Sequence, residues 1–345
     1  MLAYVYGKQN KLALLEKKPP APTEESAVIK VAATSICGTD LRTYRFGSPK
    51  IKAPRVIGHE VVGEIVAIGK DVREFSVGER VQVAPAIGCG KCADCRSGHT
   101  NVCDSLETIG FDYDGTFAEF MEIPPRAIKM GNVSKLPATV PSEQAVLAEP
   151  IACIINAHQY LKISTGDVVA IFGSGFIGCM HAELAAIEGA EKVIMIEVNP
   201  ARAEAAKKIN DRLIIVNPNK QNLGDEIKKL TGGRGVTVSI VACSVGSAQT
   251  DAMNITAKRG RISLFGGLPT VSTGFIDSNM IHYREMSVYG VHASSPAQNR
   301  EALRLISSGI LDVKPYASNI FALKDIDKAF ASLNNETIMK AIIVP

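Results

Sequence analysis

The chain of 345 residues contains no tryptophan, and aromatic residues make up only 6% of it. It also lacks a long uninterrupted apolar run. The most apolar window, Val168–Ile187, includes Gly173, Gly175, His181 and Glu183, so a strand, a turn and a helix explain it better than a membrane span. The first residues show no apolar signal-peptide core and no amphipathic transit segment. We therefore expect a cytoplasmic protein without a membrane partner.

No excess of either charge stands out. The 38 basic and 35 acidic residues are interspersed and leave a net charge of +3, so no basic stripe marks a nucleic-acid partner. Internal repeats and low-complexity tracts are also missing. The length favours about two domains.

The pattern of apolar residues changes after Pro150. Before it, short β segments are broken by glycine and proline, and helical periodicity is nearly absent, which predicts a small barrel-like domain. After it, β runs alternate with helical patterns, which predicts a parallel sheet covered by helices on both faces. The clearest predicted strands are 27–36, 61–68, 80–83, 116–123, 168–172, 192–197, 213–216, 236–242 and 261–265, and the clearest helices are 177–187, 201–209 and 298–308. The domain that receives the strand-like 341–344 stays open.

Four of the eight cysteines crowd into the spacing C-x2-C-x2-C-x7-C, formed by Cys89, Cys92, Cys95 and Cys103. Thiolates with two residues between them in a glycine-containing loop can face one zinc ion at tetrahedral geometry, and four protein ligands leave no open position. This spacing therefore predicts a structural zinc site. An iron–sulfur cluster or unligated cysteines are the alternatives.

A second set of metal-binding residue types lies outside the segment 89–103, which we call the cysteine lobe. Cys37, His59, Glu60 and Glu149 supply a thiolate, an imidazole and carboxylates, a mixture suited to catalytic zinc with one open position. Each residue alone has an ordinary structural reading, as a packed cysteine, a core histidine or a solvated glutamate. Their spacing does not show that they converge.

A glycine-rich turn follows the predicted strand 168–172. Gly173-Ser174-Gly175-Phe176-Ile177-Gly178 matches G-x-G-x-x-G and precedes a helical pattern, the context of a dinucleotide-binding turn. Glu197 ends the next strand, where a carboxylate accepts hydrogen bonds from ribose hydroxyls and repels a 2′-phosphate. The sequence therefore predicts NAD rather than NADP.

The order of these motifs resembles that of zinc-containing medium-chain dehydrogenases, in particular the sorbitol (polyol) and threonine dehydrogenase branch. The resemblance implies an α/β fold, with a GroES-like β-barrel catalytic domain at 1–150, completed by about 291–345, and a Rossmann doubly wound coenzyme domain at 151–290. It implies two zinc ions per subunit, one catalytic and one structural, and a homo-oligomer, either a tetramer or a dimer. Cys37 and His59 match catalytic zinc ligands, and Glu60 and Glu149 match acidic positions that bind zinc directly or through water. Arg202 matches a position near the adenosine, and Gly266 one near the nicotinamide.

The same resemblance assigns Thr39 to the relay that carries the alcohol proton away. Arg42 stands where the next relay member is usually a histidine, and an arginine cannot accept a proton at ordinary pH. His292 and Tyr44 are candidates for the substrate pocket, against the alternatives of a loop histidine and surface packing. The residues after Gly290 also depart from the arginine–tyrosine pair of sorbitol dehydrogenases.

The resemblance implies an enzyme that transfers hydride from a secondary alcohol of a polyol or sugar alcohol to NAD, giving a ketose. A basic stretch, Arg42, Arg45, Lys50, Lys52 and Arg55, raises the hypothesis of a phosphorylated substrate. L-threonine 3-dehydrogenase is the alternative within enzymes. A non-catalytic NAD-binding protein is the alternative outside them, and the retained metal-binding residue types argue against it.

Overall fold

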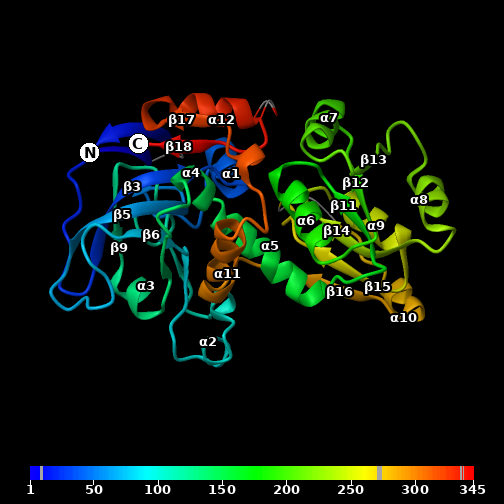
Figure 1. Cartoon of the computed structure of the whole chain (residues 1–345), viewed down its shortest axis with the longest axis horizontal. Coiled ribbons are helices and arrows are strands. Elements are labelled where there is room, and N and C mark those ends of the chain that lie inside the picture. The colour runs from blue at the N-terminus through cyan, green and yellow to red at the C-terminus, as the bar shows by residue number, and fades with distance from the viewer. Residues whose placement is uncertain (8–10, 270–273, 335, 337) are drawn as a thin grey trace. The chain divides into compact units, whose positions relative to one another are not determined.

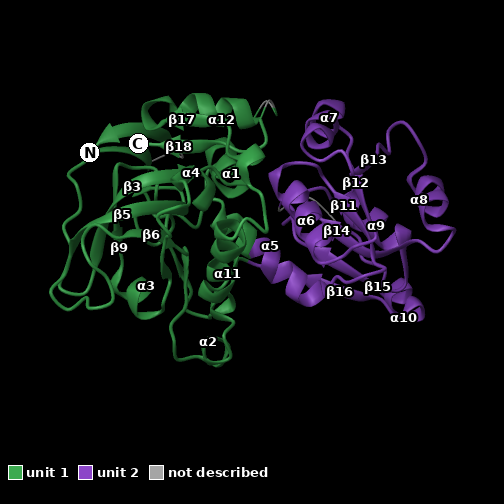
Figure 2. Cartoon of the chain, viewed as in Figure 1, with its two compact units in different colours: residues 1–152, 293–345 green, residues 153–292 purple. Residues whose placement is uncertain are grey.

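The computed structural model describes residues 1–7, 11–269, 274–334, 336 and 338–345. Residues 1–152 and 293–345 form one unit, and residues 153–292 form the other (Figure 2). The chain thus leaves the first unit once and returns to it. The helix α5 (Ala148–Leu161) contains the first of the two boundaries.

The first unit is built on a seven-stranded sheet with the order β10-β6-β5-β3-β18-β17, in which β9 also pairs with β3 (Figure 1). The C-terminal strand β18 therefore enters this unit, between β3 and β17. A second sheet has the order β2-β1-β4, and β7 pairs with β8. The strands are β1 (Leu2–Tyr6), β2 (Leu12–Glu16), β3 (Ala27–Ser35), β4 (Arg55–Val56), β5 (Glu60–Ile68), β6 (Arg80–Val83), β7 (Ala86–Ile87), β8 (Glu107–Thr108), β9 (Phe120–Ile123), β10 (Val133–Lys135), β17 (Ile320–Ala322) and β18 (Ile342–Val344).

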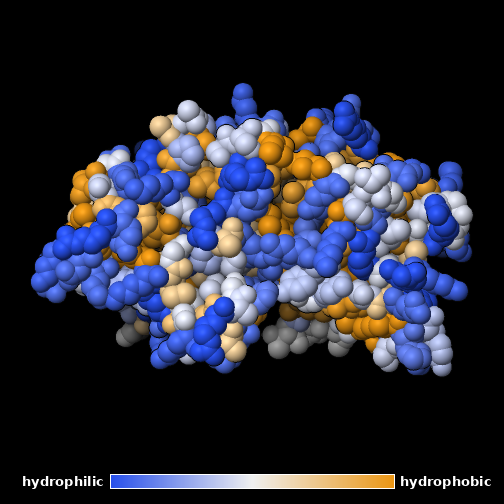
Figure 3. Space-filling model, turned by 60° about the horizontal axis from the view of Figure 1, so that its bottom comes forward, coloured by the Kyte–Doolittle hydropathy of each residue, from blue (hydrophilic) through white to orange (hydrophobic). Residues whose placement is uncertain are grey.

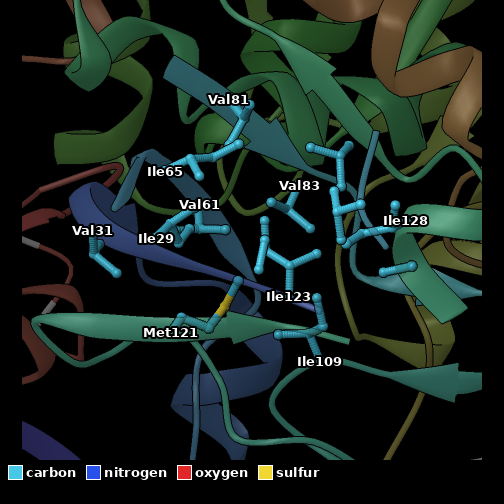
Figure 4. Packing of buried hydrophobic residues seen from close by; sticks show 14 of the residues in the cluster. Ile29, Val31, Val61, Ile65, Val81, Val83, Ile109, Met121, Ile123 and Ile128 are labelled. Carbon is cyan, nitrogen blue, oxygen red and sulfur yellow. The ribbon is translucent and has the colours of Figure 1, made fainter. Parts of the chain in front are cut away.

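The core of this unit is formed by β-branched residues that alternate along the strands. At its centre pack five side chains whose exposed fraction is at most 1%: Ile29, Val61, Ile65, Val81 and Ile123 (Figure 4). Burying such a side chain contributes about 1.5–3 kcal/mol relative to leaving it in water. The period of two along β3, β5 and β6 thus directs one face of the sheet into this core.

Helices of the first unit are short, except where the chain enters and leaves it. They are α1 (Gly38–Phe46), α2 (Ala93–Arg96), α3 (Pro125–Lys129), α4 (Ser142–Ala145), α11 (Pro296–Ser307) and α12 (Ile326–Asn334). The helix α1 was not predicted, because only Asp40 and Thr43 of its nine residues are buried and it shows no apolar period. The predicted strand 116–123 forms a ladder only from Phe120, because residues 116 and 117 bond to Gly58 and Ile57 instead.

The second unit contains a six-stranded sheet with the order β13-β12-β11-β14-β15-β16, and every pairing in it is parallel. This is the doubly wound 3-2-1-4-5-6 order. Its strands are β11 (Val168–Phe172), β12 (Lys192–Ile196), β13 (Ile214–Val216), β14 (Val236–Val241), β15 (Thr256–Leu264) and β16 (Ser287–Gly290), and its helices are α6 (Phe176–Ile187), α7 (Pro200–Ile209), α8 (Leu223–Thr231), α9 (Gly246–Ile255) and α10 (Ser278–Arg284). The strand β15 begins five residues earlier than predicted, because the charged Lys258 and Arg259, followed by Gly260, interrupt its apolar pattern.

The surface in Figure 3 shows hydrophilic residues spread over the face, with hydrophobic residues between them. Among the described residues, no helix combines the length and the apolar character needed to cross a bilayer.

Candidate metal centre and dinucleotide turn

The candidate metal centre lies where β3 ends and β5 begins. Cys37 is the N-cap of α1, two residues beyond β3, and Glu60 is the first residue of β5. Ser35 and Glu60 are directly opposite in the ladder that joins these strands. Gly58, with φ of +91°, turns the chain into His59, and a Cβ there would lie 2.5 Å from Thr116 Oγ1. Only glycine fits this approach without strain.

Cys37, His59 and Glu60 each bring one ligand atom into a group whose members lie within 4.8 Å of one another. His59 and Glu60 are buried, with 8% and 0% of their surface exposed. The Oε1 atom of Glu60 is buried and has no hydrogen-bond partner among the described residues. A buried carboxylate oxygen without a partner is costly, so a cation at this point fits the donor set.

Asp40 holds both Cys37 and His59. Its Oδ2 accepts a hydrogen bond from the backbone N–H of Cys37 at 2.9 Å. Its Oδ1 forms an ion pair of 3.4 Å with His59 Nδ1. Burial lowers the pKa of His59, but the charges of Asp40 and Cys37 outweigh it and hold that pKa well above the usual range. Because Nδ1 faces Asp40, Nε2 is the ring nitrogen available to an ion.

The other carboxylate oxygen of Glu60 is occupied. Its Oε2 accepts hydrogen bonds from Lys340 Nζ at 2.6 Å and from Ser35 Oγ. Lys340 also donates to the carbonyl of Ile36 at 3.0 Å. Burial lowers the pKa of this lysine, but the charges of Glu60, Cys37 and Glu149 raise it above the usual range. A charged lysine therefore lies behind the carboxylate.

Glu149 lies in the first turn of α5 and is 6% exposed. Its carboxylate is outside the group of mutually close ligand atoms among the described residues, although its charge acts on Lys340. The structure thus brings together three of the four residues predicted for this centre. It places the fourth nearby on a separate element.

The four cysteines of the lobe converge as well. Their sulfur atoms lie within 4.8 Å of one another, with 4.0 Å between those of Cys89 and Cys95 and 3.8 Å between those of Cys92 and Cys103. Zinc–sulfur bonds of about 2.3 Å in a tetrahedron separate the sulfurs by about 3.8 Å. Backbone N–H groups of Lys91 and Cys92 stabilise the thiolate of Cys89 and lower its pKa to about 6. All four thiols are free, so the lobe fits a closed tetrahedral ion site.

The glycine turn joins β11 to α6 in the second unit. Gly173 has φ of +99°, and a Cβ on Gly178 would lie 1.9 Å from the carbonyl oxygen of Gly173. The first glycine therefore makes the tight turn, and the third allows α6 to pack against it. A Cβ on Gly175 would meet no atom of the described chain within 4 Å. Ile177, in the first turn of α6, is half-buried. The turn fits a pyrophosphate at the helix N-terminus.

Glu197 follows β12 and is bonded to this turn. Its Oε2 accepts from the N–H and the hydroxyl of Ser174, at 2.8 and 2.9 Å, and its Oε1 accepts from the Asn199 N–H at 2.8 Å. Arg202 lies in the first turn of α7, whose N-cap is Asn199. Gly266 follows β15, and a Cβ there would lie 2.3 Å from the carbonyl oxygen of Cys243. The Glu197 carboxylate is therefore held in place by Ser174 and Asn199 before any cofactor binds.

The remaining predicted residues lie on loops and on α1. Thr39 is half-buried in the first turn of α1, and Arg42 is exposed on the same helix, three residues later. Tyr44 stacks on Phe330, with ring centroids 4.8 Å apart, so its ring packs against the core of the first unit. His292 is an exposed residue whose carbonyl accepts a hydrogen bond from Asn156.

Three residues that hold this centre were not predicted as parts of it: Asp40, Ser35 and Lys340. Asp40 could have been found, because an acid three residues after an N-cap cysteine is a capping-box position. Lys340 offered a weaker signal, a single charge before the apolar Ala341–Val344. Ser35 offered none.

Two family models match the chain. Residues 23–138 match the alcohol dehydrogenase GroES-like domain, and residues 177–308 match the zinc-binding dehydrogenase domain. The first match lies in the unit with the metal centre. The second includes Gly178, Glu197 and Gly266 in the unit with the parallel sheet.

Curated relatives cover most of the chain. L-Threonine 3-dehydrogenase of Pyrococcus abyssi is 35% identical over 320 residues, 91% of this chain and 89% of the relative. Sorbitol dehydrogenase of Bacillus subtilis is 31% identical over 314 residues, 90% of this chain and 87% of the relative. These relatives confirm the predicted family and its sorbitol and threonine branch.

Solved structures agree over the whole chain. A zinc-binding dehydrogenase from Sinorhizobium meliloti 1021 bound to NADP has a TM-score of 0.91 at 26% identity and covers 100% of this chain and 99% of that one. An alcohol dehydrogenase from E. coli CFT073 complexed with NADH has a TM-score of 0.90 at 27% identity, with the same coverage. The predicted GroES-like and Rossmann fold is thereby confirmed. The chain belongs to the zinc-dependent medium-chain alcohol dehydrogenase family, and it is an enzyme of that family.

Proposed function

We propose that this enzyme oxidises a secondary alcohol of a polyol or sugar alcohol to a ketose, with NAD as the acceptor. The convergence of Cys37, His59 and Glu60 is the observation that carries the proposal, together with one buried Glu60 oxygen that has no hydrogen-bond partner in the described part of the chain. In this reading the unit of residues 1–152 and 293–345 is the catalytic domain, and residues 153–292 form the coenzyme domain.

Cys37 Sγ, His59 Nε2 and Glu60 Oε1 would hold the catalytic zinc ion. Glu149 is within electrostatic range of Lys340 and is proposed as an acid that reaches the ion directly or through water. The four cysteines of the lobe would hold a second, structural ion. When bound, the catalytic ion supplies a Lewis acid that lowers the pKa of an alcohol, and the nicotinamide supplies the hydride acceptor.

The chain's own groups position the reactants and move the proton. Asp40 orients His59 through its Nδ1 atom, and it fixes the backbone at Cys37. The Thr39 hydroxyl, two residues from Cys37, is proposed to receive the alcohol proton. Arg42 has no ion pair among the described residues and cannot accept a proton, so the proton would leave from Thr39 Oγ1 to water.

The preference for NAD is proposed from Glu197. Its carboxylate is 5% exposed and is fixed by Ser174 and Asn199 beside the glycine turn. A fixed negative charge there accepts hydrogen bonds from ribose hydroxyls and disfavours a 2′-phosphate.

The name of the P. abyssi relative favours a second candidate substrate, L-threonine. Both this amino acid and sorbitol carry a secondary alcohol. A phosphorylated polyol is supported less by the structure than by the sequence. In the basic stretch, Arg45 bonds to Asn334 and Arg55 pairs with Asp114, which leaves Arg42, Lys50 and Lys52 for an anion.

The proposal is tested by following NADH formation at mildly alkaline pH. The panel contains sorbitol, xylitol, galactitol, inositols, L-threonine and sugar-alcohol phosphates, each with and without a zinc chelator. A chelator-sensitive rate on a polyol is expected. If only threonine is turned over, the assigned substrate is threonine and not a polyol. If protein with zinc and NAD bound turns over no member of the panel, the polyol assignment is refuted. Light scattering of the same preparation tests the proposed homo-oligomer.

A further inference from the structure

Lys340 is a buried lysine at the back of the candidate metal centre. Its side chain is 5% exposed, and that of its partner Glu60 is 0% exposed. A buried ammonium group is costly unless it is paired and hydrogen-bonded. Lys340 meets that need with the Glu60 carboxylate at 2.6 Å and the Ile36 carbonyl at 3.0 Å. The Glu60 oxygen in this contact is Oε2, whereas Oε1 is the atom proposed as a metal ligand.

Three neighbouring strands bring these groups together. Ile342 of β18 lies opposite Ser35 of β3, and Ser35 lies opposite Glu60 of β5. The backbone N–H of Ile36 donates to the carbonyl of Ala341 at 3.1 Å, so the pairing continues toward Cys37. The position of Lys340 beside Glu60 is therefore set by the register of the last strand, β18, which lies beside β3 (Figure 1).

The two oxygens of Glu60 have different surroundings. Lys340 and Ser35 both donate to Oε2, whereas Oε1 is buried with no hydrogen-bond partner among the described residues. A carboxylate held in this way offers a cation one oxygen and cannot rotate to offer both. Groups behind a metal ligand that fix its orientation typically change metal affinity 10–100-fold when removed.

The charges point the same way. A divalent ion is balanced by the Cys37 thiolate and the Glu60 carboxylate, and the Glu149 carboxylate then adds a further negative charge. The ammonium group of Lys340 offsets that charge inside the protein. Without it, the charge of Glu149 would act, uncompensated, near a poorly solvated site that already holds a carboxylate and a thiolate.

We propose that Lys340 is a positioning residue that, with Ser35, makes Glu60 a one-oxygen ligand of the catalytic metal. The inference rests on the proposed function, because it takes Cys37, His59 and Glu60 as the ligands. It adds that the C-terminal segment, through Lys340, controls how firmly the centre holds its ion.

The test measures zinc release from the full chain to a chromogenic chelator. Wild-type protein is expected to release zinc in two phases, one from the centre and one from the cysteine lobe. The variant Cys37→Ser identifies the centre, because it should lack that phase alone. Lys340→Met is expected to weaken zinc binding at the centre about 10–100-fold and to leave the lobe unchanged. Lys328→Met removes an exposed ion pair with Asp325 in the same C-terminal segment and serves as the matched control.

Two further variants keep the inference falsifiable if Lys340→Met does not fold. Lys340→Arg keeps the cation and should retain most of the affinity. Ser35→Ala removes only the hydroxyl contact to Glu60, and we expect it to lose less zinc affinity at the centre than Lys340→Met. With Co²⁺ in the centre, loss of either donor to Oε2 should change the d–d absorption, since Glu60 can then bind through both oxygens.

Wild-type affinity at the centre in folded Lys340→Met and Ser35→Ala would overturn the inference. If Cys37→Ser releases zinc as the wild type does, the ligand set itself is wrong, which is a failure of the proposed function. The two failures are therefore distinguishable.

Discussion

The Asp40 carboxylate lies between two proposed metal ligands: its Oδ1 is 3.4 Å from His59 Nδ1, and its Oδ2 accepts the Cys37 N–H at 2.9 Å. One buried acid thus holds the backbone of the cysteine by a hydrogen bond and faces the histidine ring as an ion pair. A carboxylate behind a metal-binding histidine sets the tautomer and raises its basicity.

Asp40→Asn is expected to lower the zinc affinity of the centre about 10–100-fold, because the amide keeps the shape but loses the charge. Chelator competition measures this loss. Asp225→Asn, which changes an exposed acid in the first turn of α8, is the control. Equal affinities of the two variants would contradict the role assigned to Asp40.

Glu197→Gln is expected to change the cofactor preference. The amide keeps an oxygen for Ser174, but it no longer repels a 2′-phosphate and accepts hydrogen bonds more weakly. We expect kcat/KM for NAD to fall about tenfold, equivalent to about 1.4 kcal/mol, and kcat/KM for NADP to hold or rise. Glu191→Gln, at the other end of β12, changes an exposed acid and should alter neither value. An unchanged NAD to NADP ratio in Glu197→Gln would remove the basis for the NAD assignment.

The parts of the site that depend on local spacing could be predicted from the sequence. The four lobe cysteines lie within fifteen residues, and the glycine turn follows its strand directly, so each motif is visible as one short segment. Glu197 was predictable for the same reason, as the residue that ends the next strand. The fold was predictable because strands and helical patterns alternate after Pro150.

The support behind the centre could not be predicted, because it depends on pairing between distant strands. Ser35, Glu60 and Lys340 meet only through the registers of β3, β5 and β18, which no local pattern specifies. The helix α1 was missed because its exposed face is polar and only two of its residues are buried. The sequence likewise did not show that Glu149 lies outside the close ligand group.

Gly58→Ala is expected to disturb the centre as well as the fold. A residue with φ of +91° is strained by about 1–3 kcal/mol when it is not glycine, and here the new Cβ would also lie 2.5 Å from Thr116 Oγ1. Gly78 has φ of +89° and open space around it, so Gly78→Ala measures the backbone strain alone. Gly58→Ala should lose more thermal stability than Gly78→Ala and should also hold zinc less tightly at the centre. Similar losses in both would show that the neighbours of Gly58 give way.

Cys95→Ser should remove the lobe zinc and spare the centre. Three cysteines and a hydroxyl bind zinc much more weakly than four thiolates, so zinc content should fall from about two ions to about one per chain. Metal analysis after gel filtration measures the ratio. Cys153→Ser, a cysteine outside both groups, should keep both ions. Retention of two ions by Cys95→Ser would show that the lobe does not bind zinc through this thiolate.

The buried His181 predicts how stability depends on pH. It is 0% exposed, its Nδ1 lies 3.0 Å from His158 Nε2, and His158 Nδ1 lies 2.7 Å from Glu188. Its ring also meets the Phe265 ring edge to face, with centroids 4.7 Å apart. Burial, and then the charge of His158, lower the pKa of His181 well below its usual value. The folded protein therefore keeps this imidazole neutral where the unfolded chain protonates it.

Below about pH 6.5 the unfolded state binds one more proton than the folded state, so stability falls with falling pH by up to about 1.4 kcal/mol per pH unit. His181→Leu removes this contribution. Between pH 6.5 and 5 the free energy of unfolding of His181→Leu should fall by about 2 kcal/mol less than that of the wild type. This difference in slope does not depend on how much stability the variant loses at pH 7.5 through altered packing. The control variant His282→Leu removes an exposed imidazole, so the pH dependence of its free energy of unfolding should match that of the wild type. Urea titrations across this range measure the slopes. If both variants lose stability in parallel with the wild type, His181 takes up a proton in the folded state, and the pH sensitivity arises elsewhere.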